Sequence, residues 1–169
     1  HLTSLEWPPY SGKDLPEQGA SIAVARAAFK AMGYKLEVDF FPWMRAVETA
    51  KRGETHIGYF PEYYSADIEN EFIFSDPIGS GPLGFVENKK NPVAWNSLLN
   101  LRNIEIGTVK GYVNTKEFDD LVERGVLKAD PAIDDLTNLK KVGAERIKLA
   151  VIDRYVMLYF LSSSSVGIY

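Results

Sequence analysis

The chain has 169 residues, of which 46% are apolar and 25% charged, with a net charge of −4 and no cysteine. This composition is typical of a globular protein that buries roughly two thirds of its unfolded surface. Without cysteine there is no thiol catalysis, thiolate metal site or disulfide. Because no long basic block occurs, we expect no nucleic-acid partner. The sequence contains no run of about 18 apolar residues, so it predicts no membrane span.

The first residue is His1 rather than methionine, so we expect that an N-terminal segment has been removed. A secretory signal peptide is one candidate for that segment, and a cloning remnant is another explanation. The lack of cysteine is compatible with an oxidising compartment. We therefore favour an exported protein.

The first forty residues alternate between strand and helix patterns. Leu2 to Trp7 predicts a short strand, and Pro8 to Gly12 predicts the loop that ends it. Residues 16–32 predict an amphipathic helix closed by Gly33 in the position of a C-terminal cap. Residues 36–40 alternate apolar and acidic side chains, as in a half-buried strand. The apolar face of the helix comprises Ile22, Ala25, Phe29 and Met32.

A second helix is expected to begin at Phe41-Pro42, since proline is accepted in the first turn. Residues 55–60 and 72–77 then form two further apolar runs, which we interpret as strands. The first eighty residues therefore predict the order β-α-β-α-β, which favours a parallel or mixed sheet with right-handed crossovers.

Aromatic residues follow the predicted strand ends in this half of the chain. In open α/β sheets, ligands lie beyond the carboxyl ends of the strands. The first candidates for ligand contact are therefore Tyr59, Phe60, Pro61 and Tyr63. Trp7 and Tyr10 follow the first strand, where they serve either as hydrophobic cover or as aromatic walls of a binding site.

Trp43 and Arg45 lie in the first turn of the second helix, and a helix N-terminus favours anions. Arg45 is therefore a candidate clamp for a carboxylate; the alternative is an exposed arginine paired with Glu48 or Glu54. His56 lies in a predicted strand, with no histidine nearer in sequence than His1 and no clustered carboxylates. We therefore expect no metal site.

The second half begins with a strand at 83–86, a turn at 89–91 and a short helical or irregular segment at 95–101. A strand that starts at Ile104 then passes through Gly111 into a helix that continues to Gly125. Free backbone N–H groups at the start of this helix would face a ligand. They belong to Tyr112, Val113 and Asn114. Plain capping by Asn114 or Thr115 explains these residues equally well.

Asp130-Pro131 predicts a turn, residues 135–142 a short helix, and residues 149–153 a buried strand that ends on Asp153. This aspartate is the best polar candidate in the second half. It also has the position of an N-cap for a helix at 154–161. Residues 162–165 are serine-rich and predicted to be flexible, and residues 166–169 complete the sequence.

Five segments together resemble the bacterial extracellular solute-binding proteins of family 3: EWPPYSG, FFPWMRAVETAKRGE, FIFSDPIGSGPLGFV, IEIGTVKGYVNTKEF and KLAVIDRYVMLYFL. The resemblance implies an α/β fold with two lobes of the type II periplasmic-binding-protein kind, each a mixed, mostly parallel sheet flanked by helices. We expect residues 1–81 to form the first lobe and residues 82–169 the second. The family needs no cofactor.

The resemblance also assigns site residues. Trp7 takes the position of the aromatic residue that covers the ligand in amino-acid binders, and Asp153 that of the aspartate that accepts the α-ammonium group. The usual serine and threonine contacts fall instead on Phe60, Pro61 and Tyr63. The arginine that grips the α-carboxylate falls on or beside Ile68.

Without that arginine, we expect a loss of about 1.5 to 3 kcal/mol of charge-assisted hydrogen bonding unless another group replaces it. Arg45 or the helix start at residues 112–114 is the expected replacement. The aromatic substitutions favour a flatter or more apolar solute than a basic amino acid.

The family's chain normally returns from the second lobe to the first, and this sequence stops before such a return. We therefore expect a looser hinge and uncovered apolar surface on the first lobe, which favours dimerisation or aggregation.

The resemblance implies a periplasmic protein that captures a small polar solute, an amino acid or similar, between two hinged lobes for import through an ABC permease. The alternatives are an extracellular sensory input domain of a signalling receptor and, less favoured, a cleft enzyme of the same fold. Catalysis is not expected, because His56 is the only internal histidine and no Ser/His/Asp spacing occurs. The acid pairs at 119–120 and 134–135 are interpreted as solvated charge at helix ends or turns.

Overall fold

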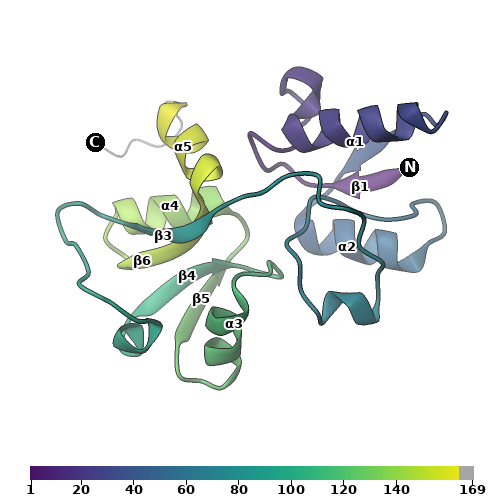
Figure 1. The fold of residues 1–169 in the computed structure, drawn as a ribbon. Coiled ribbons are helices and arrows are strands. Elements are labelled where there is room, and N and C mark those ends of the chain that lie inside the picture. Colours follow the sequence, from purple (N-terminus) through teal and green to yellow (C-terminus); the bar gives the residue numbers. More distant parts are fainter. Residues whose placement is uncertain (164–169) are drawn as a thin grey trace. The chain divides into compact units, whose positions relative to one another are not determined.

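The computed structural model describes residues 1–163 and divides the chain into two compact units, His1–Ser80 and a second that begins at Gly81 (Figure 1). Our expectations for the second half of the 162–165 segment and for residues 166–169 lie outside the described residues. Within residues 1–163, no helix is long and apolar enough to cross a membrane.

The first unit is built on two short parallel strands. Thr3 lies opposite Asp39 in their register, as the predicted β-α-β order requires. Two single-turn 3-10 helices, η1 and η2, complete the unit. The elements are β1 (Leu2–Ser4), η1 (Pro16–Gln18), α1 (Ala20–Ala31), β2 (Val38–Phe40), α2 (Trp43–Arg52) and η2 (Ile68–Asn70).

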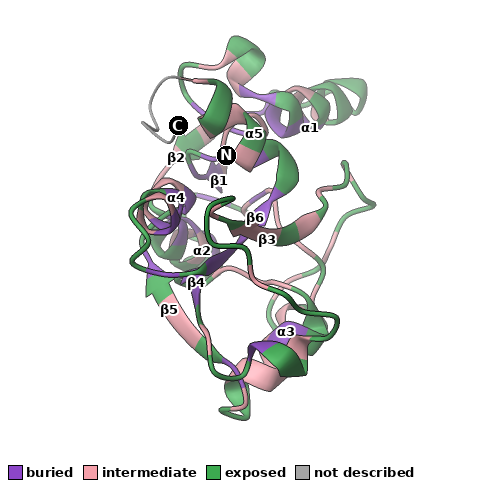
Figure 2. Cartoon of the chain, turned by 90° about the vertical axis from the view of Figure 1, so that its left-hand side faces the viewer, coloured by how far each residue is buried: buried purple, intermediate pink, exposed green. Residues whose placement is uncertain are grey.

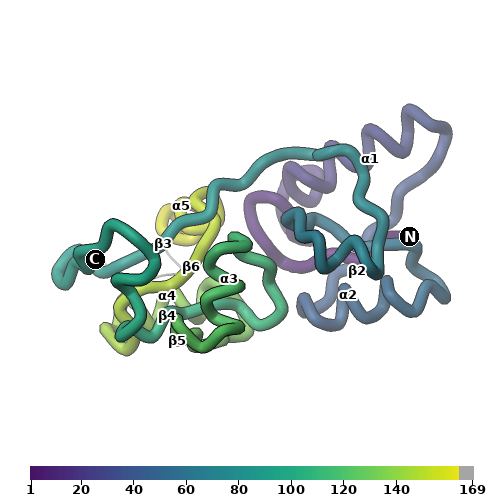
Figure 3. The backbone as a smooth tube through the Cα atoms, turned by 60° about the horizontal axis from the view of Figure 1, so that its bottom comes forward, coloured from purple at the N-terminus to yellow at the C-terminus, as the bar shows by residue number. Residues whose placement is uncertain are grey.

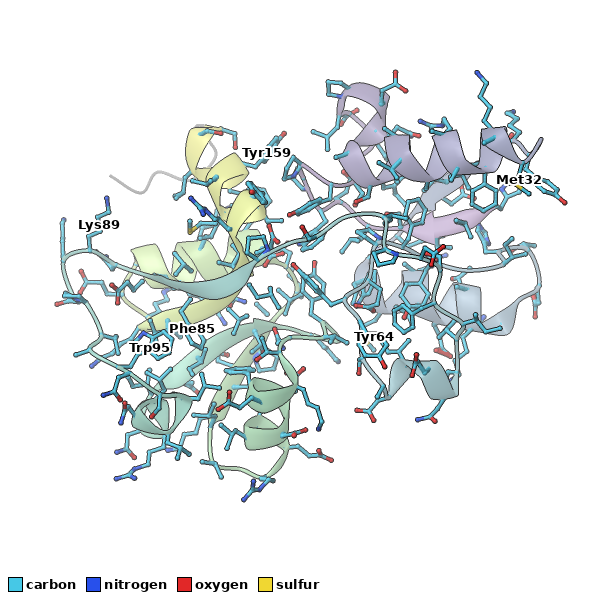
Figure 4. All side chains as sticks on the ribbon, in the orientation of Figure 1. Met32, Tyr64, Phe85, Lys89, Trp95 and Tyr159 are labelled. Atoms are coloured by element: carbon cyan, nitrogen blue, oxygen red, sulfur yellow. The ribbon has the colours of Figure 1, made fainter. Side chains whose placement is uncertain are left out.

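Helix α1 packs its buried face, Ile22 and Ala25, against Leu36 and Phe60, which forms the core of this unit. The prediction that Met32 shares that face is wrong, since its side chain is 76% exposed. The helix ends at Ala31, so Met32 leaves the helical spacing as the C-terminal cap and lies at the end of α1 (Figure 4).

The predicted strand at 55–60 is reduced to a single bridge between Tyr59 and Thr3. The segment still runs along β1, because Thr3 donates its N–H to the Gly58 carbonyl and accepts from the Phe60 N–H. Pro61 follows and has no N–H to extend the ladder. A regular strand is therefore the wrong description, although the pairing direction is parallel as expected.

The predicted strand at 72–77 is wrong. These residues form no ladder with any strand of the described chain, and Ile73 is fully exposed. In Figure 3 the chain makes the short turn of η2 and then runs on without regular structure to the next strand. An apolar run predicts a strand only where a neighbouring strand is available to pair with it.

The second unit contains one four-stranded sheet in the order β3-β6-β4-β5. β3 is antiparallel to β6 and the other pairs are parallel, so the predicted mixed, mostly parallel sheet is confirmed. β6 is buried along its whole length (Figure 2). The elements are β3 (Leu83–Glu87), η3 (Leu98–Leu101), β4 (Glu105–Val109), α3 (Lys116–Glu123), β5 (Lys128–Ala132), α4 (Asp135–Gly143), β6 (Leu149–Asp153) and α5 (Arg154–Ser162).

The two faces of this sheet bury alternate residues of β6. Leu149 and Val151 pack in a core with Phe118 of α3, whereas Ala150 packs against Val142 of α4. Figure 1 accordingly shows α3 on one side of the sheet and α4 with α5 on the other. At the edge strand β3, Phe85 meets Trp95 edge to face, with ring centroids 5.3 Å apart (Figure 4).

The turn predicted at Asp130-Pro131 is wrong, since both residues lie within β5. β5 is an edge strand of the described sheet, where a proline without N–H is tolerated. Lys141 of α4 donates to the Asp130 carboxylate at 2.6 Å and ties this edge to the helix.

Candidate functional site

The candidate site of the first unit is a group of aromatic residues that we call the aromatic cluster. Trp7 stacks on Tyr10 with centroids 4.7 Å apart and meets Tyr63 edge to face at 6.0 Å. Tyr59 meets Trp43 at 5.3 Å and Phe72 at 4.8 Å, both edge to face. The cluster comprises Trp7, Tyr10, Trp43, Tyr59, Tyr63 and Phe72.

A tight turn after β1 positions Trp7 and Tyr10. The Trp7 N–H donates to the Ser11 carbonyl at 2.8 Å, and the buried Ser11 hydroxyl donates to the Leu5 carbonyl. The Tyr10 carbonyl accepts the N–H of Ser21 in the first turn of α1. The turn is therefore fixed to the start of the helix.

Gly19 makes this attachment possible. Its φ is +105°, and a Cβ built on it would lie only 2.4 Å from the Tyr10 carbonyl oxygen. Only glycine adopts this conformation without strain and leaves room for so close a backbone. The sequence motif at Pro8 to Gly12 thus depends on a glycine several residues away.

Glu62 lies within the aromatic cluster and connects its two halves. Its carboxylate accepts the backbone N–H of Tyr63 at 2.8 Å and the hydroxyl of Tyr59 at 3.3 Å. Burial raises the pKa of Glu62 to about 7, although these two hydrogen bonds act in the opposite direction. Burial and the nearby Glu62 carboxylate in turn raise the pKa of Tyr59.

Glu62 forms no ion pair with a cationic side chain of residues 1–163. A partly buried carboxylate among aromatic rings is expensive to ionise without such a partner. The Glu62 carboxylate is therefore suited to pair with a cation from outside the chain. Glu62 was not among the site residues predicted from the sequence, although an acidic residue between Pro61 and Tyr63 was the available signal.

The remaining candidates of the first unit lie in different environments. Phe60 is buried in the core beside Ile22, and Pro61 is half-buried next to Glu62. Arg45 is exposed, with its guanidinium carbon 4.9 Å from the centre of the Phe41 ring. The expected alternative pairs of Arg45 with Glu48 or Glu54 are absent from the described contacts, and its role as a carboxylate clamp stays a prediction.

The expectation of free N–H groups at the start of α3 is wrong for two of three residues. The Tyr112 N–H donates to the Val109 carbonyl, and the Asn114 N–H donates to the Asp119 carboxylate at 2.9 Å. Asn114 also donates its side-chain amide to Asp119. Asn114, Tyr112 and Val113 are half-buried, and Thr115 rather than Asn114 caps the helix.

Asp153 ends β6 with only 1% exposure. Its Oδ1 accepts the N–H groups of Tyr155 at 2.7 Å and Val156 at 3.1 Å, so it is the N-cap of α5. The capping alternative is thus observed, and binding of an ammonium group by Asp153 stays a prediction.

Two expectations about charged residues need correction. Asp135 is buried, not solvated, while its neighbour Asp134 caps α4 through the Thr137 N–H. His56 does have a carboxylate partner, since its Nε2 lies 2.8 Å from Asp39 Oδ2. The contact of His56 with Asp39 is not visible in sequence spacing, because it depends on how segments far apart in the chain pack, whereas the Asp134 cap is local.

No protein-family model and no curated protein matches the chain. Solved structures do match. An ancestral arginine-binding protein bound to arginine is 19% identical, with a TM-score of 0.77 over 97% of this chain and 74% of its own. A histidine kinase sensor domain with similarity to periplasmic binding proteins is 18% identical, with a TM-score of 0.77 over 99% of this chain and 74% of its own.

A third match is the amino acid ABC transporter substrate-binding protein AbpA from Streptococcus pneumoniae bound to L-arginine. It is 14% identical, with a TM-score of 0.74 over 96% of this chain and 71% of its own. At identities this low the likeness establishes the fold. The chain has the α/β fold of two-lobed periplasmic binding proteins, as the resemblance of its five sequence segments indicated.

Proposed function

We propose that the chain is a non-catalytic solute-binding protein whose solute carries a cationic amino group. The observation that carries this proposal is Glu62, a partly buried carboxylate that lies among aromatic rings and forms no ion pair within the described chain. Aromatic faces attract cations through their quadrupole. A carboxylate supplies the charge-assisted hydrogen bond that fixes an amine in place.

The ligands of two matched structures support the choice of solute class, since AbpA and the ancestral protein are both described as bound to arginine. Amino acids and small amines both carry the required ammonium group. Asp153 in the second unit is a further candidate for that group, and Arg45 is the candidate for a carboxylate. Trp7, Tyr10, Trp43, Tyr59 and Tyr63 supply the aromatic walls.

In this proposal the protein acts in the periplasm and delivers its solute to an ABC permease. The alternative is a sensory input domain of a signalling receptor, which the match to a histidine kinase sensor domain favours. Genomic context separates the two, because a permease gene beside this one supports import and a fused or adjacent kinase supports sensing.

Tryptophan fluorescence tests the solute proposal directly, because two of the three tryptophans, Trp7 and Trp43, belong to the aromatic cluster. The Trp95→Phe background removes the third. We expect saturable quenching by at least one of L-arginine, L-glutamine, 1,4-diaminobutane and glycine betaine. Lack of saturable quenching by all four contradicts the proposal.

Glu62→Gln then removes the charge and keeps the shape. Loss of a charge-assisted contact of about 1.5 to 3 kcal/mol weakens binding tenfold to over a hundredfold. The matched control is Glu69→Gln, since Glu69 also accepts a tyrosine hydroxyl, from Tyr64 at 3.1 Å, but is exposed. Equal affinity of the Glu62 and Glu69 variants excludes Glu62 from the site.

A further inference from the structure

Two histidines and an aspartate meet at the edge of the first unit's sheet. One nitrogen each of His1 and His56 and an oxygen of Asp39 lie within 4.8 Å of one another. His56 Nε2 is 2.8 Å from Asp39 Oδ2, and His1 Nδ1 is 3.6 Å from the same oxygen. The geometry points to a binding site for a divalent transition metal, for which Zn²⁺ is the probe.

The parallel pairing of three segments creates this cluster. β2 pairs with β1 so that Asp39 lies beside Thr3, and the His1 carbonyl accepts the Ile57 N–H on the other side. Side chains alternate along a strand, so His1 and Thr3 point to the same face as Asp39. His56 lies just before Ile57, outside any regular strand, and its Nε2 lies 2.8 Å from Asp39 Oδ2.

Each imidazole is already oriented through its second nitrogen. His56 Nδ1 is in hydrogen-bond contact with Thr55 Oγ1 at 2.8 Å, and His1 Nε2 lies 3.4 Å from Glu37 Oε2. Glu37 is itself held by Lys35 at 2.6 Å. Such outer partners fix the ring orientation of metal-binding histidines and leave the inner nitrogens for the metal.

The donor set selects the class of metal. Two imidazole nitrogens and one carboxylate oxygen suit Zn²⁺ in a tetrahedral site with one open position, whereas Mg²⁺ and Ca²⁺ prefer oxygen ligands. Metal–ligand distances of about 2.0 to 2.2 Å require the three donors to approach one another. His1 and Asp39 are half-exposed, whereas His56 is buried.

This site lies at the other end of β1 from the aromatic cluster, since His1 precedes the strand and Trp7 follows it. It therefore does not depend on the proposed solute. An ion there would join β1, β2 and the segment after α2. Binding of metal to the folded state alone would also stabilise the first unit.

Isothermal titration of Zn²⁺ into the chain tests the proposal. We expect saturable binding of one ion per chain that persists in millimolar Mg²⁺. Asp39→Asn and His56→Gln each remove a ligand and should weaken binding at least tenfold. Thr55→Val removes only the outer partner of His56 and should weaken it by about tenfold or more with the ligands intact. The matched control Asp76→Asn changes an exposed carboxylate elsewhere and should have no effect.

Co²⁺ absorption provides a second readout, because the intensity of its visible bands reports tetrahedral coordination. His56 is buried, so the exposed Asp39→Asn variant is the decisive one if His56→Gln fails to fold. No saturable Zn²⁺ binding overturns the proposal. Binding that Asp39→Asn leaves unchanged also overturns it, because the metal is then held by His1 alone or elsewhere.

Discussion

At the scale of single residues, the proposed site depends on the protonation of Glu62. Its pKa of about 7 means that the carboxylate ionises only near neutral pH. A bound cation favours the ionised form, so binding and deprotonation assist each other. The tyrosine hydroxyl and backbone N–H that contact Glu62 keep it oriented in either state.

The raised pKa predicts how Glu62→Gln changes stability. The pKa of Glu62 is about 7 in the folded protein and about 4.5 in the unfolded chain. Below pH 4.5 the carboxyl is protonated in both states and does not change the free energy of unfolding. Between pH 4.5 and about 7 it lowers the free energy of unfolding increasingly, because the unfolded chain ionises first. We therefore expect the variant to gain stability relative to the wild type at pH 8 but not at pH 4.5. Urea denaturation at both values measures this. An equal difference at the two values would show that the pKa is not raised.

Arg45→Ala tests the predicted carboxylate clamp. Arg45 is exposed and contacts the Phe41 ring, so its removal should change stability by less than about 1 kcal/mol. If it binds the carboxylate of an amino acid, affinity for that solute falls tenfold to a hundredfold, whereas affinity for a simple diamine stays constant. Fluorescence titration with L-arginine and 1,4-diaminobutane compares the two. Unchanged affinity for both removes Arg45 from the site.

At the scale of elements, the position of the Trp7–Tyr10 turn depends on the start of α1. Gly19→Ala places a Cβ against the Tyr10 carbonyl at a positive φ. Gly33→Ala is the matched control, since Gly33 has φ +81° and a Cβ added to it would meet no atom within 4 Å. We expect about 1 kcal/mol of destabilisation for the control and clearly more for Gly19→Ala.

Thermal denaturation measures both glycine variants, and tryptophan fluorescence shows whether Trp7 changes its surroundings. The structure predicts such a change for Gly19→Ala alone. Equal destabilisation of the two variants would mean that the close approach to Tyr10 is unimportant.

The sequence predicted those elements whose signals are local. The buried run at Leu149–Asp153 predicted strand β6 with the bounds that the structure shows. Thr115, one of two residues predicted to cap α3, is the observed cap. The segment expected as a strand at 55–60 runs along β1 but makes only a single bridge with it. The strand expected at 72–77 failed because a strand needs a partner, which composition does not supply. The same holds for the contact of Asp39 with His56, which arises from the register of segments far apart in the chain.

At the scale of the whole molecule, the order of elements and the match to 74% of the ancestral arginine-binding protein define the fold. Four aromatic residues of the cluster were predicted from their positions after strand ends, Trp43 was predicted from the start of the second helix, and Phe72 was not predicted. The structure brings Trp7, Tyr10 and Tyr63 together. Glu62 was not found, because its value as a site residue lies in its burial and its lack of a cationic partner among the described residues. Both are properties of the folded chain.

The most direct test of the account is a thermal melt at pH 8 with cations and their neutral counterparts of similar shape. The pairs are choline with 3,3-dimethyl-1-butanol and 1,4-diaminobutane with 1,4-butanediol. A ligand at 100 times its dissociation constant stabilises the fold by about 2.7 kcal/mol, which raises the melting temperature by several degrees. We predict that a cation shifts the melt more than its counterpart and that the shift shrinks at pH 5.5, where Glu62 is protonated. A melt that no cation shifts, or a shift that Glu62→Gln retains in full, would contradict the account.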